Sequence, residues 1–316
     1  MLLRLRGEGR IVILVTHKLA EALAVADRIT VLRRGRVVAH RARGEVTEDE
    51  LAVLMIGELA PSPQGARTTG AVGAVALEVK DLVVERDGWR ALDGVNLEVA
   101  AGEIVGIAGI DGNGQSELVE AMAGVRRPLS GLILVDAAAA DDRVGGGAIA
   151  VIPENRDLDG LVLEMPLWEN LLLARPLLGR ACGRFGWLSA SRASALCAEL
   201  LERFHIRAAG PQALAAELSG GNRQRLCVAR ALESRPSVLV AHNVTRGLDL
   251  AATVEVHRML AAFAAEGGAV LLVSSDLDEL IALCGRLAVI SRGRLRAVGG
   301  DERDPARLGL LMAGAW

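Results

Sequence analysis

Apolar and polar residues alternate in two rhythms along most of the chain, and each rhythm predicts a different kind of element. Leu77–Val84 alternates at every second residue, as a half-buried strand does, whereas Leu277–Leu283 has helical spacing. The pattern predicts strands at Leu77–Val84, Val95–Val99, Glu103–Gly109, Ile149–Ile152, Val238–Ala241 and Val270–Ser274. It predicts helices at Ser116–Ala123, Leu167–Leu201 with breaks near Pro176 and Gly183–Gly186, Asn222–Leu232, Ala251–Ala264 and Leu277–Leu283, and a hairpin at Leu287–Val298. Alternating strands and helices indicate an α/β fold with a largely parallel sheet and an antiparallel edge.

A stretch near the N-terminus recurs without a gap near the C-terminus. Ile11–Val38 matches Ala269–Arg296, so that position 17 matches position 275, an offset of 258 residues. A repeat of this length indicates two copies of one domain. The first copy would need roughly 180 further residues before Met1. We therefore expect the chain to begin inside a domain, through a mis-called start, a split gene or a disrupted gene. We expect Ile11–Thr16 to be a strand whose neighbours lie in the missing portion, so that its apolar edge is exposed.

The repeat and the local composition together predict three parts. Residues 1–60 are expected to be the C-terminal fragment of a first domain, and residues 76–316 a complete second domain. Residues 61–75 between them are rich in Pro, Gly and small residues, as interdomain linkers are.

Composition argues against several classes of function. No apolar run approaches the ~18–20 residues that cross a bilayer, while 51% hydrophobic residues provide for a substantial core. The net charge of −3 gives no support for binding nucleic acid. The four Cys are scattered without a C-x-x-C pair, which is typical of a reduced, metal-free compartment. We expect a protein that is cytoplasmic or held at a membrane by a partner.

A Gly-rich loop between a predicted strand and a predicted helix carries the first candidate chemistry. It reads GIDGNGQS, close to the phosphate-binding pattern G-x-x-x-x-G-K-S/T. Its glycines allow backbone N–H groups to converge on a phosphate at a helix N-terminus. The loop has an uncharged Gln in place of the Lys, so a nucleotide site and an ordinary Gly-rich turn both stay open at this point. The candidate nucleotide-binding residues are Gly109, Ile110, Asp111, Gly112, Asn113, Gly114, Gln115 and Ser116, with Ser116 also a weak Mg²⁺ ligand.

A second motif indicates which family the chain resembles. Leu218–Arg225 reads LSGGNRQR, which closely resembles the signature motif of ABC ATPases. An isolated Ser-Gly-Gly is more often a serine cap before a helix. Here it follows the phosphate loop by about 100 residues and precedes a predicted buried strand, as in ABC ATPases.

Further motifs extend this resemblance over almost all of Leu77–Val298. Val238–Asp249 (VLVAHNVTRGLD) resembles the Walker B strand and the loop after it, and Ile152–Arg156 (IPENR) resembles the Q-loop region. Val273–Leu277 occupies the H-loop position. The N-terminal repeat Ile11–Val38, which includes Thr16-His17, resembles the tail of another such domain.

Within the superfamily, the resemblance is strongest to the tandem-domain ATPases of sugar and nucleoside importers. Their second domains carry sequences like D-G-N-G-Q-S-E-L, I-P-E-x-R-x-x-D-G-L and T-R-G-L-D, and the loop Gln points toward the nucleoside branch. The resemblance implies an ABC-type P-loop fold with a helical subdomain, ATP and Mg²⁺ as cofactors, and a place at the cytoplasmic face of the membrane. It implies as partners a second nucleotide-binding domain, permease subunits that dock at Glu154–Leu173 and, through them, a substrate-binding lipoprotein, with no nucleic acid.

The resemblance also implies that the second domain has lost its own catalytic groups. Gln115 replaces the phosphate-binding Lys, and His242 stands where the Mg²⁺-supporting Walker B Asp should be. Asn243 replaces the catalytic Glu, and Ser275 replaces the H-loop His. Glu154 replaces the usual Gln, and a carboxylate near Mg²⁺ could partly compensate. We expect this site to bind nucleotide weakly at most and not to turn it over.

The groups that act on a neighbouring domain are retained. By the resemblance, Ser219, Gly220 and Gly221 contact the γ-phosphate held by the other domain, and Asp249 communicates across the pair. His17 would contact the γ-phosphate as the H-loop residue of the first domain. The chain alone is expected to have little or no ATPase activity, because the phosphate loop and catalytic Glu of that first site are not part of it.

Two other functions stay open. One is a soluble tandem ABC protein of the translation-factor type, although such proteins have a long charged linker and residues 61–75 are nearly uncharged. The other is a non-catalytic, truncated relic. Of the remaining candidates for chemistry, His257 has no matched partner in the sequence and is expected at the surface or on a helix face.

Overall fold

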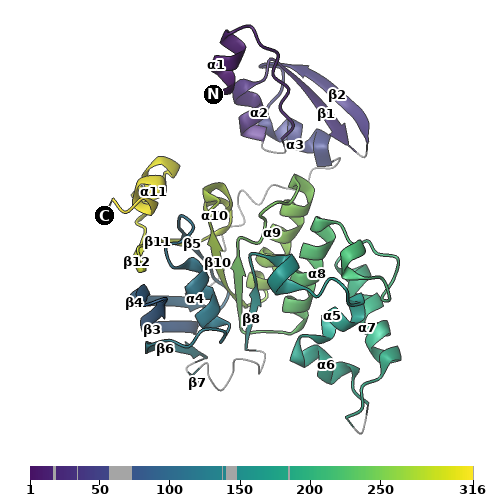
Figure 1. Cartoon of the computed structure of the whole chain (residues 1–316), viewed down its shortest axis with the longest axis vertical. Helices are drawn as coiled ribbons and strands as arrows, with labels where there is room; N and C mark the ends of the chain where they lie inside the picture. The colour runs from purple at the N-terminus through teal and green to yellow at the C-terminus, as the bar shows by residue number, and fades with distance from the viewer. Residues whose placement is uncertain are drawn as a thin grey trace. The chain divides into compact units, whose positions relative to one another are not determined.

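The computed structural model describes residues 1–16, 19–33, 35–56, 73–136, 138–139, 148–183 and 186–315. These residues form two compact units (Figure 1). The smaller unit consists of Met1–Ser62 with Gly247–Glu255, and the larger of Pro63–Arg246 with Val256–Trp316. Of the expected linker, residues 61–72 lie outside the described part of the chain.

The smaller unit combines short helices with a two-stranded antiparallel sheet. Its elements are α1 (Leu2–Gly7), α2 (Leu19–Val25), β1 (Arg28–Arg33), β2 (Arg36–Ala42) and α3 (Glu48–Ile56). Thr47 and Glu50 form a capping box at the start of α3: the Glu50 N–H donates to Thr47 Oγ1 (3.3 Å), and the Thr47 N–H donates to Glu50 Oε2 (2.8 Å). The small core contains Leu19, Val31, Ala39, Val46 and Leu51.

The strand predicted at Ile11–Thr16 is wrong. These residues belong to no strand, and Ile11 and Ile13 are 94% and 86% exposed. A strand needs a neighbour for its backbone hydrogen bonds, and none of the described strands pairs with this segment. The apolar run on its own was therefore an insufficient signal.

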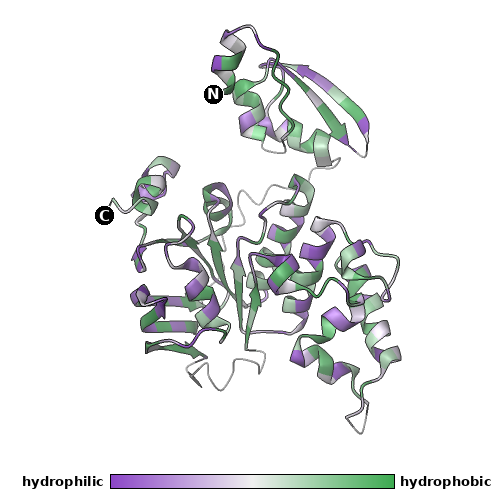
Figure 2. Ribbon diagram, viewed as in Figure 1, coloured by the Kyte–Doolittle hydropathy of each residue, from purple (hydrophilic) through white to green (hydrophobic). Residues whose placement is uncertain are grey.

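The larger unit is built on a six-stranded sheet with the order β12-β11-β5-β10-β9-β8. Its strands are β5 (Ile104–Ala108), β8 (Ile149–Ile152), β9 (Val238–His242), β10 (Ala269–Ser274), β11 (Arg286–Ser291) and β12 (Arg294–Ala297). All neighbours pair in parallel except β11 and β12. Strands β5, β9 and β10 are buried along their whole length, which explains their continuous apolar runs (Figure 2). The predicted parallel sheet is confirmed, as is the hairpin turn at Arg292–Gly293.

A second, antiparallel sheet has the order β4-β3-β6-β7. It contains β3 (Val75–Arg86), β4 (Trp89–Ala100), β6 (Ser130–Val135) and β7 (Ala138–Ala139). Asp87 and Gly88 both have positive φ in the β3–β4 turn, as a two-residue hairpin requires. Apolar side chains of β3 and β4 share one core with β5 and with Leu118 and Met122 of α4 (Gln115–Met122).

The remaining helices follow the predicted order with adjusted ends. They are α5 (Leu167–Leu172), α6 (Arg175–Ala181), α7 (Ala190–Arg203), α8 (Gly220–Glu233), α9 (Leu250–Ala265), α10 (Leu277–Leu283) and α11 (Pro305–Met312). The break between α5 and α6 falls just before Pro176, which sits in the first turn of α6 where its missing N–H costs nothing. Within the described residues, no helix combines the length and apolarity needed to span a membrane.

Two charged residues fix α8 to its surroundings. Arg230 donates to the carbonyl oxygens of Gly160 (2.5 Å) and Asn170 (3.2 Å), and burial lowers the pKa of its guanidinium. Glu233, 7% exposed, pairs with Arg180 of α6 and Arg203 of α7. The helix that starts at the Ser-Gly-Gly motif is therefore anchored to α5, α6 and α7.

Close packing at β5 generates a stability prediction. A methyl group on Gly106 would meet Cys284 Sγ and Leu287 Cδ2 at 2.7 Å and Leu280 Cδ2 at 2.9 Å. Gly106→Ala should lower the free energy of unfolding by about 1–3 kcal/mol. Gly179→Ala in α6, where nothing lies within 4 Å, should raise it by about 0.5–1 kcal/mol. Urea denaturation measures both; equal effects at the two positions contradict the packing of β5 against α10.

Candidate functional site

Four loops of the larger unit leave the carboxyl ends of neighbouring parallel strands. The loop after β5 contains residues 109–114, and Glu154 follows β8. Asn243 follows β9, and Ser275 follows β10. The carboxyl ends of parallel strands are where α/β sheets place ligands. The fold therefore brings most of the candidate residues predicted for the second domain to one edge of one sheet.

The backbone of the phosphate loop has the conformation that its glycines were expected to allow. Gly112 (φ 89°) and Gly114 (φ 109°) are both in the left-handed region, and Gly114 caps α4. A Cβ on Gly114 would lie 2.6 Å from the carbonyl oxygen of Ala91. Only glycine fits there. The loop thus opens a helix N-terminus, the position at which backbone N–H groups bind anions.

The side chain of Gln115 folds back across this loop. Its Nε2 donates to the carbonyl oxygen of Ile110 (2.9 Å), and its Oε1 accepts the backbone N–H of Asn113 (3.1 Å). Gln115 is only 6% exposed. The Asn113 side chain also donates to Ile110 and accepts the Arg292 N–H (2.8 Å). The backbone N–H of Asn113, one of the loop N–H groups that could bind a phosphate, is therefore already bonded to the neutral side chain of Gln115.

A charged cluster lies beside the loop. Arg246 Nη1 pairs with Glu154 Oε1 and lies 3.7 Å from Asp111 Oδ2. His242 Nε2 lies 3.8 Å from Glu154 Oε2. Burial lowers the pKa of His242, and this outweighs the opposite influence of Glu154 and Asp111. The imidazole of His242 is accordingly neutral at pH 7. It lies at the end of β9, beside the Glu154 carboxylate that is paired with Arg246.

Asn243 is held in a strained backbone conformation by β10. Its φ is 45°, its N–H donates to the carbonyl oxygen of Val273 (2.8 Å), and its Oδ1 accepts the N–H of Ser275 (2.9 Å). It is 6% exposed. An amide cannot take a proton from an attacking water as a carboxylate does. Asn243 and Ser275 thus form a neutral hydrogen-bonded pair. General-base catalysis would need a carboxylate or another proton acceptor in place of the amide.

A buried carboxylate supports the loop after β9. Glu279, 5% exposed, accepts from Thr245 Oγ1 (2.9 Å) and Ser274 Oγ (2.6 Å) and lies 3.0 Å from His257 Nε2. Of the two expectations for His257, the helix face is confirmed, since it lies in α9, and the surface is wrong, because the residue is 7% exposed and bonded to Glu279. Helical spacing alone did not reveal this partner, which comes from the following helix. Glu279 holds Thr245 in place, directly before Arg246.

The Ser-Gly-Gly motif forms an exposed helix N-terminus. Ser219 caps α8, since its Oγ accepts the N–H (3.4 Å) and Nδ2 (3.1 Å) of Asn222. The capping role and a role in binding do not exclude each other, because the Ser219 residue is exposed. A Cβ on Gly220 would lie 3.0 Å from Arg156 Nη2, and Arg156 Nη1 donates to the carbonyl oxygen of Arg246 (3.2 Å).

Two further candidate residues, Asp249 and His17, do not belong to the described part of the larger unit. Asp249 belongs to the segment that groups with the smaller unit, where its Oδ1 caps α9 by accepting the Ala252 N–H (2.8 Å). His17 lies outside the described residues. Two participants were missed from the sequence, Arg156 and Arg246, although both stand in the quoted motifs IPENR and VTRGLD. A basic residue inside an otherwise acidic or polar motif was the available signal.

The site fits a phosphate group in part and Mg²⁺ poorly. The loop backbone presents N–H groups at a helix N-terminus, although the Asn113 N–H is bonded to Gln115. Mg²⁺ requires oxygen ligands, chiefly carboxylates and water. Here Glu154 is paired with a guanidinium and the neighbouring His242 is a neutral nitrogen donor. Across the described ranges, no group of three or more His, Cys, Asp or Glu side chains could hold a metal ion.

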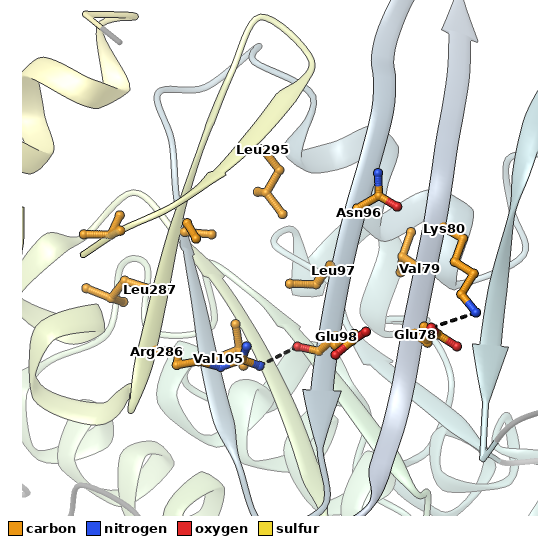
Figure 3. A pocket seen from close by; sticks show the side chains of 13 residues that line it. Glu78, Val79, Lys80, Asn96, Leu97, Glu98, Val105, Arg286, Leu287 and Leu295 are labelled. Atoms are coloured by element: carbon orange, nitrogen blue, oxygen red, sulfur yellow. Dashed lines mark hydrogen bonds and ion pairs between the residues drawn. The ribbon is translucent and has the colours of Figure 1, made fainter. Parts of the chain in front are cut away.

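A separate pocket of about 400 Å³ lies between the two sheets, lined by residues of β3, β4, β5, β11 and β12 (Figure 3). Lys80 Nζ pairs with Glu78 (2.8 Å), and Arg286 Nη2 donates to the carbonyl oxygen of Glu98 (2.6 Å). The basic side chains of this pocket are thus already paired within the protein. None of the candidate site residues lines it.

Comparison with known proteins agrees with the motifs. Residues 92–246 match the family model described as ABC transporter. The chain is 39% identical to the nucleoside import ATP-binding protein NupA of Lactococcus lactis, over 97% of this chain and 62% of that protein. It is 37% identical to the guanosine import ATP-binding protein NupO of Bacillus subtilis (98% and 61%). It is 34% identical to the ribose import ATP-binding protein RbsA of Yersinia pestis (96% and 59%). The chain thus spans about three fifths of the length of these relatives.

Solved structures show the same fold. An ATP-binding subunit of an ABC transporter matches with a TM-score of 0.58 and 22% identity, over 76% of this chain and 95% of that chain. A dimeric ATP-binding cassette in a post-hydrolysis state with ADP and Pi matches with a TM-score of 0.60 and 23% identity (71% and 99%). The larger unit therefore has the ABC-type P-loop nucleotide-binding fold, which implies binding of ATP or ADP. The chain contains an ABC transporter ATP-binding domain and is homologous over nearly all of its length to nucleoside and ribose import ATP-binding proteins.

Proposed function

We propose that the chain is part of the energy-coupling subunit of an ABC importer for nucleosides or sugars. The names of the relatives support this substrate class, and the Gln in the phosphate loop favours the nucleoside branch. One observation carries the proposal: an exposed Ser-Gly-Gly helix N-terminus stands in the same domain as a phosphate site without Lys, catalytic Glu or His.

The Ser219 end of α8 acts on nucleotide held by another domain. The Ser219 hydroxyl and the N–H groups of Gly220 and Gly221 can donate to a γ-phosphate, and the N-terminal end of the α8 dipole favours its negative charge. Asp249 communicates with the neighbouring domain. His17, in the smaller unit, serves as the H-loop residue of that neighbour, and residues 1–60 are the tail of that neighbouring domain.

The domain's own site does not hydrolyse ATP. Gln115 brings no charge to the β- and γ-phosphates, and Asn243 cannot act as a base. His242 is neutral where a metal-supporting carboxylate would be needed, and Ser275 uses its N–H to hold Asn243. Three of the replacing residues, Gln115, Asn243 and Ser275, form hydrogen bonds to other residues of the same unit.

The partners follow from this role. Permease subunits dock at Glu154–Leu173, which runs from the segment after β8 into α5 and contacts α8 through Arg230. A substrate-binding lipoprotein acts through the permease, and Mg²⁺·ATP is hydrolysed at the site that Ser219 completes. The complex lies at the cytoplasmic face of the membrane and involves no nucleic acid.

The first prediction concerns an importer assembled with a complete ATP-binding subunit. Ser219→Arg should lower its ATPase rate by about 100-fold or more, because a donor to the transition state is replaced by a bulky side chain. Gln115→Ala and Asn243→Ala should each leave the rate within about threefold. Steady-state phosphate release measures all three. A large loss of turnover in the last two variants would show that the second-domain site is catalytic.

A second prediction concerns the purified chain alone. It should hydrolyse ATP at the background rate, because its phosphate loop carries Gln115 and the position of the catalytic Glu is occupied by Asn243, which cannot act as a base. The control is the Ser219→Arg chain, which should be indistinguishable from it. Hydrolysis clearly above background that disappears in Ser219→Arg contradicts the proposal.

A third prediction concerns His242. Burial lowers its folded-state pKa below the ordinary 6.5, so the unfolded chain binds more protons at mildly acidic pH. The free energy of unfolding should therefore fall as pH drops through 6.5 towards the lower folded-state pKa. His242→Gln should reduce this loss by at most about 1.4 kcal/mol per pH unit, whereas His40→Gln at an exposed position should not. Urea denaturation between about pH 7 and about pH 5.5 measures it; equal pH slopes for the wild-type and His242→Gln chains contradict a buried neutral imidazole.

A further inference from the structure

One side chain contacts groups from several loops of the candidate site. The Arg246 guanidinium pairs with Glu154 in the segment after β8 and lies 3.7 Å from Asp111 in the phosphate loop. Its backbone carbonyl accepts from Arg156 Nη1 (3.2 Å), whose Nη2 faces Gly220 of the Ser-Gly-Gly motif. Arg246 thus connects the loops after β5, β8 and β9 and, through Arg156, the start of α8.

The charges around Arg246 are those that call for a cation at its position. Glu154 and Asp111 are acidic and His242 is neutral. Two carboxylates that converge on one point repel each other unless a cation lies between them. Arginine suits this position because its planar fork offers several donors to separate carboxylates and stays charged at every accessible pH.

The loop that presents Arg246 is itself fixed. The Arg246 N–H donates to the carbonyl oxygen of Asn243 (3.0 Å), and the preceding Thr245 is bonded to the buried Glu279 (2.9 Å). The turn that carries the Arg246 guanidinium is therefore held in place by hydrogen bonds and is not a free surface loop. An isolated exposed ion pair contributes little, but here two carboxylates and a backbone carbonyl are engaged by one residue.

The phosphate loop is also assembled without a ligand. Gln115 bridges the Asn113 N–H and the Ile110 carbonyl, the two sides of the loop. We propose that Arg246 is a built-in cation that takes the place of Mg²⁺ in this site and holds its loops together in the absence of nucleotide and metal. This inference deepens the assignment of the site as non-hydrolytic and rests on it.

Hydrogen exchange on the whole chain in EDTA, without nucleotide, tests the holding role. Arg246→Gln should speed exchange by about tenfold or more in residues 109–116 and 153–157, and not in residues 190–203 of α7. Arg294→Gln is the matched control, because Arg294 is similarly exposed (68% against 60%) and also pairs with an aspartate, Asp93. Unchanged exchange in both loop segments of Arg246→Gln overturns the proposal.

Mn²⁺ binding in the absence of nucleotide tests whether Arg246 takes the place of a metal ion. An arginine with a purely structural role would not affect the Mn²⁺ affinity. Removing the guanidinium frees Glu154 and Asp111 as oxygen ligands, so Arg246→Gln should bind Mn²⁺ at least about fivefold more tightly than the wild type in electron paramagnetic resonance titrations. Arg294→Gln should bind it like the wild type. Equal Mn²⁺ affinity of wild type and Arg246→Gln overturns the proposal. The substitution is on an exposed side chain, and thermal melting within a few degrees of the wild type verifies that the fold is intact.

The two measurements separate this inference from the proposed function. Both use the chain by itself and neither involves the contact of Ser219 with another domain. An importer whose ATPase ignores Ser219→Arg refutes the coupling role and leaves these results in place. Conversely, Mn²⁺ binding that ignores Arg246→Gln refutes the built-in cation and leaves the coupling role in place.

Discussion

The loops of the larger unit's own site all leave one edge of one parallel sheet, and this convergence constrains every residue on them. Strands β5, β8, β9 and β10 end side by side, so a substitution in one loop must be accommodated by the others. Residues of different loops do contact one another: Asn243 bonds to Ser275, and Arg246 pairs with Glu154. These contacts between loops support the proposal that the site is kept for its shape and not for hydrolysis.

The Ser-Gly-Gly end of α8 is positioned by different contacts. Arg230 and Glu233 anchor the helix to the carbonyl oxygens of Gly160 and Asn170 and to α6 and α7. Gly160 and Asn170 lie in the proposed permease-docking segment, so under that proposal α8 is connected to the docking segment through the buried Arg230. The proposed role of α8 therefore depends on contacts that are separate from those of the domain's own site.

Much of the fold could be predicted from local patterns, because its elements satisfy local rules. The continuous apolar runs of β9 and β10 and the amphipathic spacing of α10 matched the observed ends within about a residue. The strand expected at Ile11–Thr16 failed because a strand depends on a partner elsewhere in the chain. The burial of His257 and the contacts of Arg246 were missed for the same reason: Glu279, Glu154 and Asp111 approach them only through tertiary folding.

The central claim is that Ser219 meets nucleotide bound by a neighbouring domain, and cross-linking tests it most directly. Ser219→Cys would be paired with a cysteine in the phosphate loop of the neighbouring domain of an assembled importer, with Ser189→Cys, the cap of α7, as the control. ATP should strongly increase cross-linking of Ser219→Cys and leave that of Ser189→Cys unchanged. Cross-linking of Ser219→Cys that is absent, or that does not respond to ATP, would contradict it.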